Sequence, residues 1–316
     1  MDRFLWMNSF ARVVETGSFS AVARELQTGQ PNVSRHIAAL ERHLGTRLLH
    51  RSTRKLTLTP EGERYYNEAR RVLDALQEAE SNARGEDSAR GLLRVSCPTL
   101  LGRTHVLPHM KTLLDRYPDL EIDLQVGDRY VDLIEEGVDL AVRIGLLKDS
   151  SLRARRIGFA HRLCAASAGY LDRHPAPTRP EELTDHDCIV YTLSADAGTW
   201  TFKGVEVAVH GRVRVNTPDG VRSAMLDGLG IGYAPRWLFD DAVGDGRAKA
   251  LLEGQYGPPA PIHIVYAANR LLPRRARVFM DFIAAQFAQD PLFNAEARAA
   301  RRPGAAPTDE KRAPGK

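Results

Sequence analysis

The sequence predicts an all-α domain at the start of the chain, a long connecting helix, and a larger α/β domain. Three observations predict this arrangement. In residues 1–59, apolar side chains recur at helical spacing. In residues 60–90, they recur at alternating intervals of four and three residues, with no helix breaker between Glu63 and Arg84. In residues 91–290, apolar runs of strand length alternate with helical patterns, which is typical of a parallel sheet with helical crossovers.

Residues 1–59 are predicted to form three helices and a hairpin. Gly17 suits the end of the first helix, and Ser18 suits the N-cap of the second. Residues 27–29 form a tight turn, and Pro31 suits the first turn of the third helix. That third helix buries one apolar stripe, which consists of Val33, Ile37, Leu40 and Leu44. A hairpin with a cationic tip follows, so this order predicts a winged helix-turn-helix.

The opposite face of the third helix suits the major groove of DNA. Ala38 lets the helix approach a duplex closely, Arg35 can reach a base edge, and Ser34 a base or a phosphate. The cationic tip can contact phosphates or enter a minor groove, although a charge run alone is more often a solvated loop. The predicted DNA-binding residues are Ser18, Ser20, Gln30, Pro31, Asn32, Ser34, Arg35, Ala38, Arg51, Ser52, Thr53, Arg54 and Lys55.

The segment SFSAVARELQTGQPNVSRHIAALERHLGTRLLHRSTRKLTLTPEGE resembles the DNA-binding domain of LysR-type transcriptional regulators. The family order is SFSxAAxxL, then QPxVSxxIxxLExxLGxxLFxR, then xLTxxG. Three residues depart from it. Gln27 replaces the usual glycine of the turn, which implies either strain or a different turn geometry. Gly29 replaces the serine that usually caps the third helix and supplies no side-chain oxygen, and Leu49 replaces a common phenylalanine.

The composition agrees with a DNA-binding protein of several domains. The 316 residues are 43% hydrophobic and carry a formal net charge of +4. Residues 1–59 hold nine Lys or Arg against four Asp or Glu, so the cationic excess lies on the predicted DNA-binding domain. With no apolar run of membrane-spanning length and no signal sequence, a cytoplasmic location and no membrane partner are expected. The three scattered cysteines, Cys97, Cys164 and Cys188, predict no disulfide framework.

Residues 60–90 are predicted to be a dimerisation helix followed by a polar hinge at 85–91. The a and d positions are Tyr65, Ala69, Val72, Leu76, Ala79 and Ala83. The alternative is that this helix packs on the core of its own domain. A twofold dimer would place two recognition helices on successive major-groove faces. The resemblance implies the same, because family members dimerise through this helix and commonly form tetramers.

Residues 91–290 are predicted to form two α/β lobes with a cleft between them, where small ligands bind. The predicted strands lie at 92–96, 121–126, 138–142, 162–166, 206–209, 212–215, 231–234 and 262–267. The predicted helices lie at 106–116, 131–136, 221–229 and 275–287. Residues 291–316 form a tail without periodicity, which is predicted to be disordered.

The motifs DLIEEGVDLAVRIG at 132–145 and GLGIGYAP at 228–235 resemble the LysR effector-binding domain, which implies the two-lobed fold of periplasmic binding proteins. The resemblance implies effector contacts at Thr99, Leu100, Gly127, Arg143, Asn216, Thr217, Ala234 and Pro235. Thr99 and Thr217 offer hydroxyls near exposed N–H groups, which could hold a carboxylate or a polar ring substituent. Arg143 either neutralises an anion or pairs with Asp128, Asp132 or Asp139.

The predicted function is a ligand-responsive transcriptional regulator that binds promoter DNA as a homodimer or homotetramer and is switched by a small-molecule effector. RNA polymerase is an expected partner. The alternative is a sequence-nonspecific, nucleoid-type DNA binder with a ligand-binding domain. No enzyme activity, cofactor, metal or catalytic residue is expected, because the usual nucleophile, phosphate-loop and dinucleotide motifs are missing. His105 and His109 lie four residues apart but lack further ligands, and Cys97 is expected to be a buried small hydrophobe.

Overall fold

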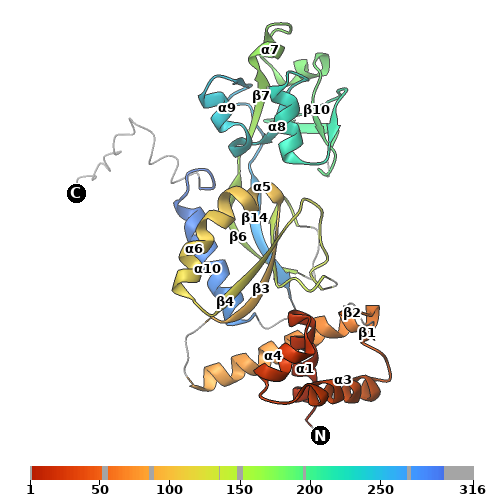
Figure 1. Ribbon diagram of the computed structural model, residues 1–316. Coiled ribbons are helices and arrows are strands. Elements are labelled where there is room, and N and C mark those ends of the chain that lie inside the picture. Colours follow the sequence, from red (N-terminus) through yellow and green to blue (C-terminus); the bar gives the residue numbers. More distant parts are fainter. Residues whose placement is uncertain are drawn as a thin grey trace, which may run out of the picture.

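The computed structural model describes residues 2–51, 56–84, 89–134, 136–147, 152–194, 197–268 and 272–294. Three bodies follow one another through the molecule (Figure 1). The N-terminal helical domain lies at one end, next to the long helix α4. Lobe I of the effector domain lies in the middle, and lobe II lies at the far end. The order predicted from the sequence is therefore the order in space.

The N-terminal domain is the predicted winged helix-turn-helix. Its elements are α1 (Arg3–Thr16), α2 (Phe19–Glu25), α3 (Gln30–Leu44) and the antiparallel strands β1 (Leu49–Arg51) and β2 (Leu56–Leu58). Helix α1 ends at Gly17, which is left-handed at φ 64°. The Ser18 side chain caps α2 by accepting the N–H of Ala21 at 3.2 Å. The predicted helix boundaries are confirmed here.

Two of the departures from the family pattern have structural consequences. Gln27 has φ 50°, so the turn keeps a left-handed geometry and a non-glycine residue occupies it under strain. Gly29 caps α3 without a side-chain hydrogen bond. The third, Leu49, is simply buried in the domain core at 2% exposure. The turn geometry is therefore strained rather than altered.

The core of this domain is built from one face of each helix. It contains Phe10, Val13, Val22, Val33, Ile37, Leu40 and Leu48, together with Tyr66 from α4. Leu44, which the sequence assigned to the same stripe, is 38% exposed, so that prediction is wrong. It is the last residue of α3, immediately before the left-handed Gly45, where the helix has already passed the core.

Helix α4 (Pro60–Arg84) divides the predicted a and d positions into two groups. Tyr65 packs on Phe10, with 5.7 Å between the ring centroids, and Ala69 is buried. Val72 and Leu76 are 42% and 40% exposed, and Ala79 and Ala83 are also exposed. The first half of the helix therefore packs within its own chain, and only the second half leaves its apolar positions uncovered.

Lobe I is a five-stranded sheet of order β4-β3-β5-β14-β6. Its strands are β3 (Gly91–Cys97), β4 (Leu120–Val126), β5 (Leu140–Ile144), β6 (Leu152–Ala160) and β14 (Ala260–Ala267). Strands β4 and β5 pair parallel with β3, as predicted, and β14 runs antiparallel to β5 and β6. The helical segments are α5 (Thr99–Leu101), a π-helical turn at Gly102–Val106, α6 (Leu107–Arg116) and α10 (Arg274–Gln289).

Lobe II is centred on a three-stranded sheet of order β12-β7-β13. Its strands are β7 (Arg162–Ser167), β8 (Val190–Tyr191), β9 (Thr199–Phe202), β10 (Val205–Ala208), β11 (Arg214–Val215), β12 (Gly232–Pro235) and β13 (Ala248–Leu251). Its α-helices are α7 (Ala168–Leu171), α8 (Pro218–Leu226) and α9 (Asp240–Gly244), with 3₁₀ turns at Pro180–Asp185 and Arg236–Leu238. The chain crosses between the lobes after β6 and again before β14, as two lobes with a cleft require.

Several sequence predictions for this domain need correction. The predicted helix at 131–136 is only a hydrogen-bonded turn in its described residues, because one turn before the left-handed Gly137 is too short to propagate a helix. Strand β6 was missed because four of its nine residues are arginine or glycine and mask the alternation. Phe293, assigned to the tail, is 1% exposed and stacks on Phe287 at 4.2 Å. The domain core therefore reaches past residue 290, and residues 295–316 lie outside the described part.

Candidate DNA interface and effector cleft

Helix α3 presents its predicted DNA face to solvent. Gln30, Pro31 and Arg35 are exposed, and Asn32, Ser34 and Ala38 are half-buried beside them. Among the described residues, the Arg35 guanidinium has no carboxylate partner. A cation on a helix whose other face is buried, with no ion pair to a described residue, is available for a base edge or a phosphate.

The remaining predicted DNA-binding residues fall into three groups. Ser18 is occupied as the cap of α2, whereas Ser20 is exposed and donates to the Gln30 side chain at 3.4 Å, a weak bond. Asn32 donates to the Thr28 hydroxyl at 2.7 Å, which orients the start of α3. The backbone of Arg51 lies in β1 opposite Leu56. Ser52, Thr53, Arg54 and Lys55 lie outside the described residues, so their contacts stay a prediction.

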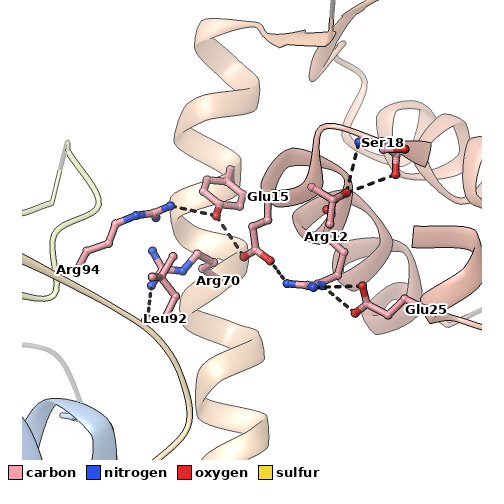
Figure 2. Close-up of polar contacts among 9 residues, drawn as sticks. Arg12, Glu15, Ser18, Glu25, Arg70, Leu92 and Arg94 are labelled. Atoms are coloured by element: carbon pink, nitrogen blue, oxygen red, sulfur yellow. Dashed lines mark hydrogen bonds and ion pairs between the residues drawn. The ribbon is translucent and has the colours of Figure 1, made fainter. Parts of the chain in front are cut away.

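A chain of polar contacts connects this domain to the effector domain through α4. The Tyr66 hydroxyl donates to Glu15 of α1 at 3.2 Å and accepts from Arg94 of β3 at 3.3 Å. Glu15 pairs with Arg12, which also pairs with Glu25 of α2 at 2.8 Å. Figure 2 shows Arg12, Glu15 and Glu25 on one side of the helix and Arg94 on the other.

A buried ion pair lies next to this chain of contacts. Arg70 of α4 lies 3.3 Å from Asp139, and their side chains are only 9% and 2% exposed. Arg70 also donates to the Leu92 carbonyl at 3.2 Å (Figure 2). Asp74, one turn further on, pairs with Arg275 of α10, although burial raises the pKa of the Asp74 carboxyl. Helix α4 is therefore fixed to lobe I by charged contacts as well as by packing.

A cavity of about 1000 Å³ lies between the lobes. Four of the predicted effector residues line it: Gly127, Arg143, Ala234 and Pro235. The other four do not lie on its wall. Leu100 is buried in the apolar core that continues into lobe II, and the Thr217 hydroxyl caps α8 by accepting the Gly220 N–H at 3.1 Å. Asn216 is exposed, and the Thr99 N–H is already bonded to Asp128 at 3.0 Å.

Of the two alternatives for Arg143, the ion pair with a nearby aspartate does not form among the described residues, and contact with an anionic ligand stays a prediction. Arg143 donates to the Val131 carbonyl at 2.7 Å, and its guanidinium lies 4.7 Å from the centroid of the Tyr130 ring. In the described part of the chain it pairs with none of the three nearby aspartates. Its charge therefore lines the cavity without an ion pair to a described carboxylate.

Two family profiles match the chain. The profile "Bacterial regulatory helix-turn-helix protein, lysR family" matches residues 4–63, and "LysR substrate binding domain" matches residues 86–288. The chain belongs to the LysR family of transcriptional regulators. The resemblance found in the motifs, the fold and the prediction of a DNA-binding regulator with an effector domain are confirmed.

Individual relatives cover almost the whole LysR-type chain. CrgA of Neisseria meningitidis serogroup C is 35% identical over 282 residues, spanning 87% of this chain and 93% of that one. The uncharacterized regulator YhjC of Escherichia coli is 34% identical over 291 residues, spanning 90% and 97%. The solved structure of N. meningitidis CrgA matches with a TM-score of 0.57 at 33% identity, covering 89% of this chain and 97% of that one. Full-length AphB of Vibrio cholerae matches with 0.55 at 32%, covering 89% and 98%.

Several cavity residues of this regulator were missed by sequence reasoning. Arg162, Tyr191, Trp200, Thr201 and Tyr233 all line the cavity from lobe II. Tyr233 lies in the motif GLGIGYAP, but no spacing signal marked it as a wall residue. Trp200 and Thr201 lie on β9, a strand that was not predicted, so nothing in the sequence placed them in the cleft.

The described residues hold no group of side chains suited to a metal ion, and no helix there is long and apolar enough to span a membrane. All three cysteines are buried, which confirms the expectation for Cys97. Burial raises the pKa of each thiol, that of Cys188 to about 12, so the thiolate needed for redox chemistry is disfavoured.

Proposed function

We propose that this LysR-type regulator binds promoter DNA through α3 and the wing as a cytoplasmic homodimer or homotetramer, acts on RNA polymerase, and is switched by a small molecule in the cavity between the lobes. It needs no catalytic step and no cofactor. The observation that carries the DNA assignment is Arg35, an exposed cation without a described partner on a helix whose opposite face forms the domain core.

Fluorescence anisotropy with the DNA upstream of the protein's own gene tests the interface. Arg35→Ala is expected to weaken binding by about tenfold or more, because one good base contact contributes about 1–3 kcal/mol. Arg64→Ala is the matched control, since Arg64 is an exposed arginine of α4 paired with Glu61. Equal affinity of both variants and the unchanged protein would contradict the assigned contact.

Competition with random DNA at fixed salt separates a promoter regulator from the nucleoid-type alternative. A regulator is expected to prefer its own promoter fragment over random DNA by about a thousandfold or more. A nucleoid-type binder would show no preference beyond base composition. Mapping the protected bases with and without a panel of small molecules then tests whether a ligand changes the length or bend of the bound DNA.

The exposed half of α4 supports the proposed dimer. Val72 and Leu76 are apolar, lie four residues apart and are about two-fifths exposed. Light scattering is expected to show a smaller assembly for a Val72→Glu, Leu76→Glu double variant than for the unchanged chain. An unchanged mass would show that association uses another surface.

A further inference from the structure

Positively charged side chains around the cavity outnumber negatively charged ones, and they lack carboxylate partners among the described residues. Among the described residues, three arginines and one carboxylate line it: Arg129, Arg143 and Arg162, and Asp128. That carboxylate accepts the Thr99 N–H at 3.0 Å. In the described part of the chain, none of the three guanidinium groups pairs with a carboxylate. Among the described residues that line it, the cavity therefore holds more positive charge than negative charge, and its guanidinium groups are not paired with carboxylates.

Arg162 is the best placed of these cations. It is half-buried at the start of β7, opposite Pro235 of β12, where the chain enters lobe II. Its guanidinium lies 5.2 Å from the centroid of the Tyr233 ring, and the Tyr233 hydroxyl is fixed by donating to the Thr201 carbonyl at 2.9 Å. A guanidinium held over an aromatic ring keeps its N–H groups directed sideways, where a carboxylate can be bound by two of them. Arg143 is held in the same way over Tyr130 from lobe I.

Asp128 occupies the position where an anionic ligand would otherwise bind the backbone. The Thr99 amide, which the sequence suggested as a carboxylate site, is bonded to a carboxylate of the protein itself. Burial, and after it the negative charge of Asp128, raises the pKa of Tyr191 to about 12, so the Tyr191 hydroxyl stays protonated. A ligand anion is therefore repelled from this end of the cavity and attracted to the arginines.

The uncharged part of the wall is largely apolar and partly aromatic. Tyr191, Trp200 and Tyr233 contribute aromatic rings, and Val142, Ile144 and Val221 contribute aliphatic surface. Such a wall favours a planar, apolar ligand body over a sugar, whose hydroxyls would need more polar partners.

We propose that the effector is an organic carboxylate with a flat apolar body, bound through its carboxylate by Arg162 and Arg143 and kept off the Thr99 amide by Asp128. The inference rests on the proposed role of the cavity as the effector site. It assigns Arg162 and Asp128 as the residues that decide the chemical class of the ligand.

The test uses the full-length protein and measures binding of benzoate and 2-naphthoate by calorimetry, with benzamide, 2-naphthamide and phenyl phosphate as comparison ligands. At least one acid is expected to bind about tenfold or more tightly than its neutral amide, because a charged hydrogen-bonding partner is left unsatisfied by the amide. Arg162→Gln is expected to remove most of that preference. Asp128→Asn keeps an acceptor for the Thr99 amide and is expected to bind the acid about threefold or more tightly.

Lys111→Gln is the control, because Lys111 pairs with Asp115 on the outer surface of α6 and loses the same charge. The inference is overturned if amides bind as well as acids, if phenyl phosphate binds best, if Arg162→Gln folds normally and keeps full affinity, or if no acid binds at about 10 mM. A neutral compound that changes DNA protection would leave the proposed function standing and the ligand class wrong. An acid that binds through Arg162 without changing DNA protection would support the ligand class and contradict the proposed role of the cavity as the effector site.

Discussion

Removing the negative charge of Asp139 should destabilise the effector domain by about 3 kcal/mol. The side chains of Asp139 and Arg70 are 2% and 9% exposed and lie 3.3 Å apart. Asp139→Asn preserves an oxygen that can accept the Arg94 N–H, now 3.0 Å away, but leaves the Arg70 guanidinium buried without its partner. Losing one member of a buried pair typically costs about 3–5 kcal/mol. The lower end is expected, because Asp74 also lies within electrostatic reach of Arg70.

The assay is thermal unfolding followed by circular dichroism. For a domain of about 200 residues, a loss of 3 kcal/mol lowers the Tm by about 6–12 °C. Asp115→Asn, which breaks the exposed pair with Lys111, is expected to change stability by less than about 0.5 kcal/mol. The double variant Arg70→Met, Asp139→Asn should recover most of the loss, because no buried charge then remains unpaired. A cost below about 1 kcal/mol for Asp139→Asn alone would refute this account of the interface.

Three further predictions follow from single residues. Gln27→Gly should raise the free energy of unfolding of the N-terminal domain by about 0.5–1 kcal/mol, because relief of left-handed strain at φ 50° exceeds the extra chain entropy of glycine; urea titration measures it. Thiol titration of the native protein should find all three cysteines unreactive until denaturant is added, and rapid modification would contradict their burial. Burial lowers the pKa of His105 in the folded protein below the value of about 6.5 for an unfolded chain. The contribution of neutral His105 to the free energy of unfolding is therefore present above about pH 6.5 and is lost as the pH falls towards the lowered pKa. His105→Phe should therefore lose less stability than the unchanged protein between about pH 7 and pH 5 in urea titrations.

The helix-turn-helix could be predicted from sequence because its determinants are local. Ser18 caps α2 by bonding an N–H only three residues away, and Gly17 and Gly45 each end the helix that precedes them. The buried stripe of α3 follows from the helical period. The three parallel strands of lobe I were also predicted, since β3 and β5 contain short apolar runs and β4 alternates apolar and polar residues. The same reasoning failed for Leu44, whose exposure depends on where the core ends rather than on helical period.

The cavity wall could be predicted only in part, because its residues meet through folding at long range. Arg143 lies in a motif that can be recognised. Arg162 follows β6, a strand whose arginines hide the usual alternation of apolar and polar residues, and Trp200 lies on a short hairpin strand. Thr99 was suggested as a carboxylate site by the family pattern and by a hydroxyl near exposed backbone N–H groups. In the folded protein the Thr99 N–H donates to Asp128, which lies 29 residues later in the sequence. Residue spacing does not reveal such a tertiary contact.

Helix α4 shows how one apolar stripe can serve two surfaces. Its a and d positions predict pairing along the whole helix, but Tyr65 packs on the core of the N-terminal domain and Ala69 is buried within the chain. On the neighbouring face, Tyr66 and Arg70 bind lobe I through strand β3, whose far end reaches the cavity at Ser96 and Cys97. The apolar a and d positions of α4 that remain exposed to a second copy therefore begin at Val72. A dimer contact in that second half of the helix would not disturb the contacts that link strand β3 to the DNA-binding domain within each subunit. The first half of α4 would then connect the domains of one subunit, and the second half would connect two subunits.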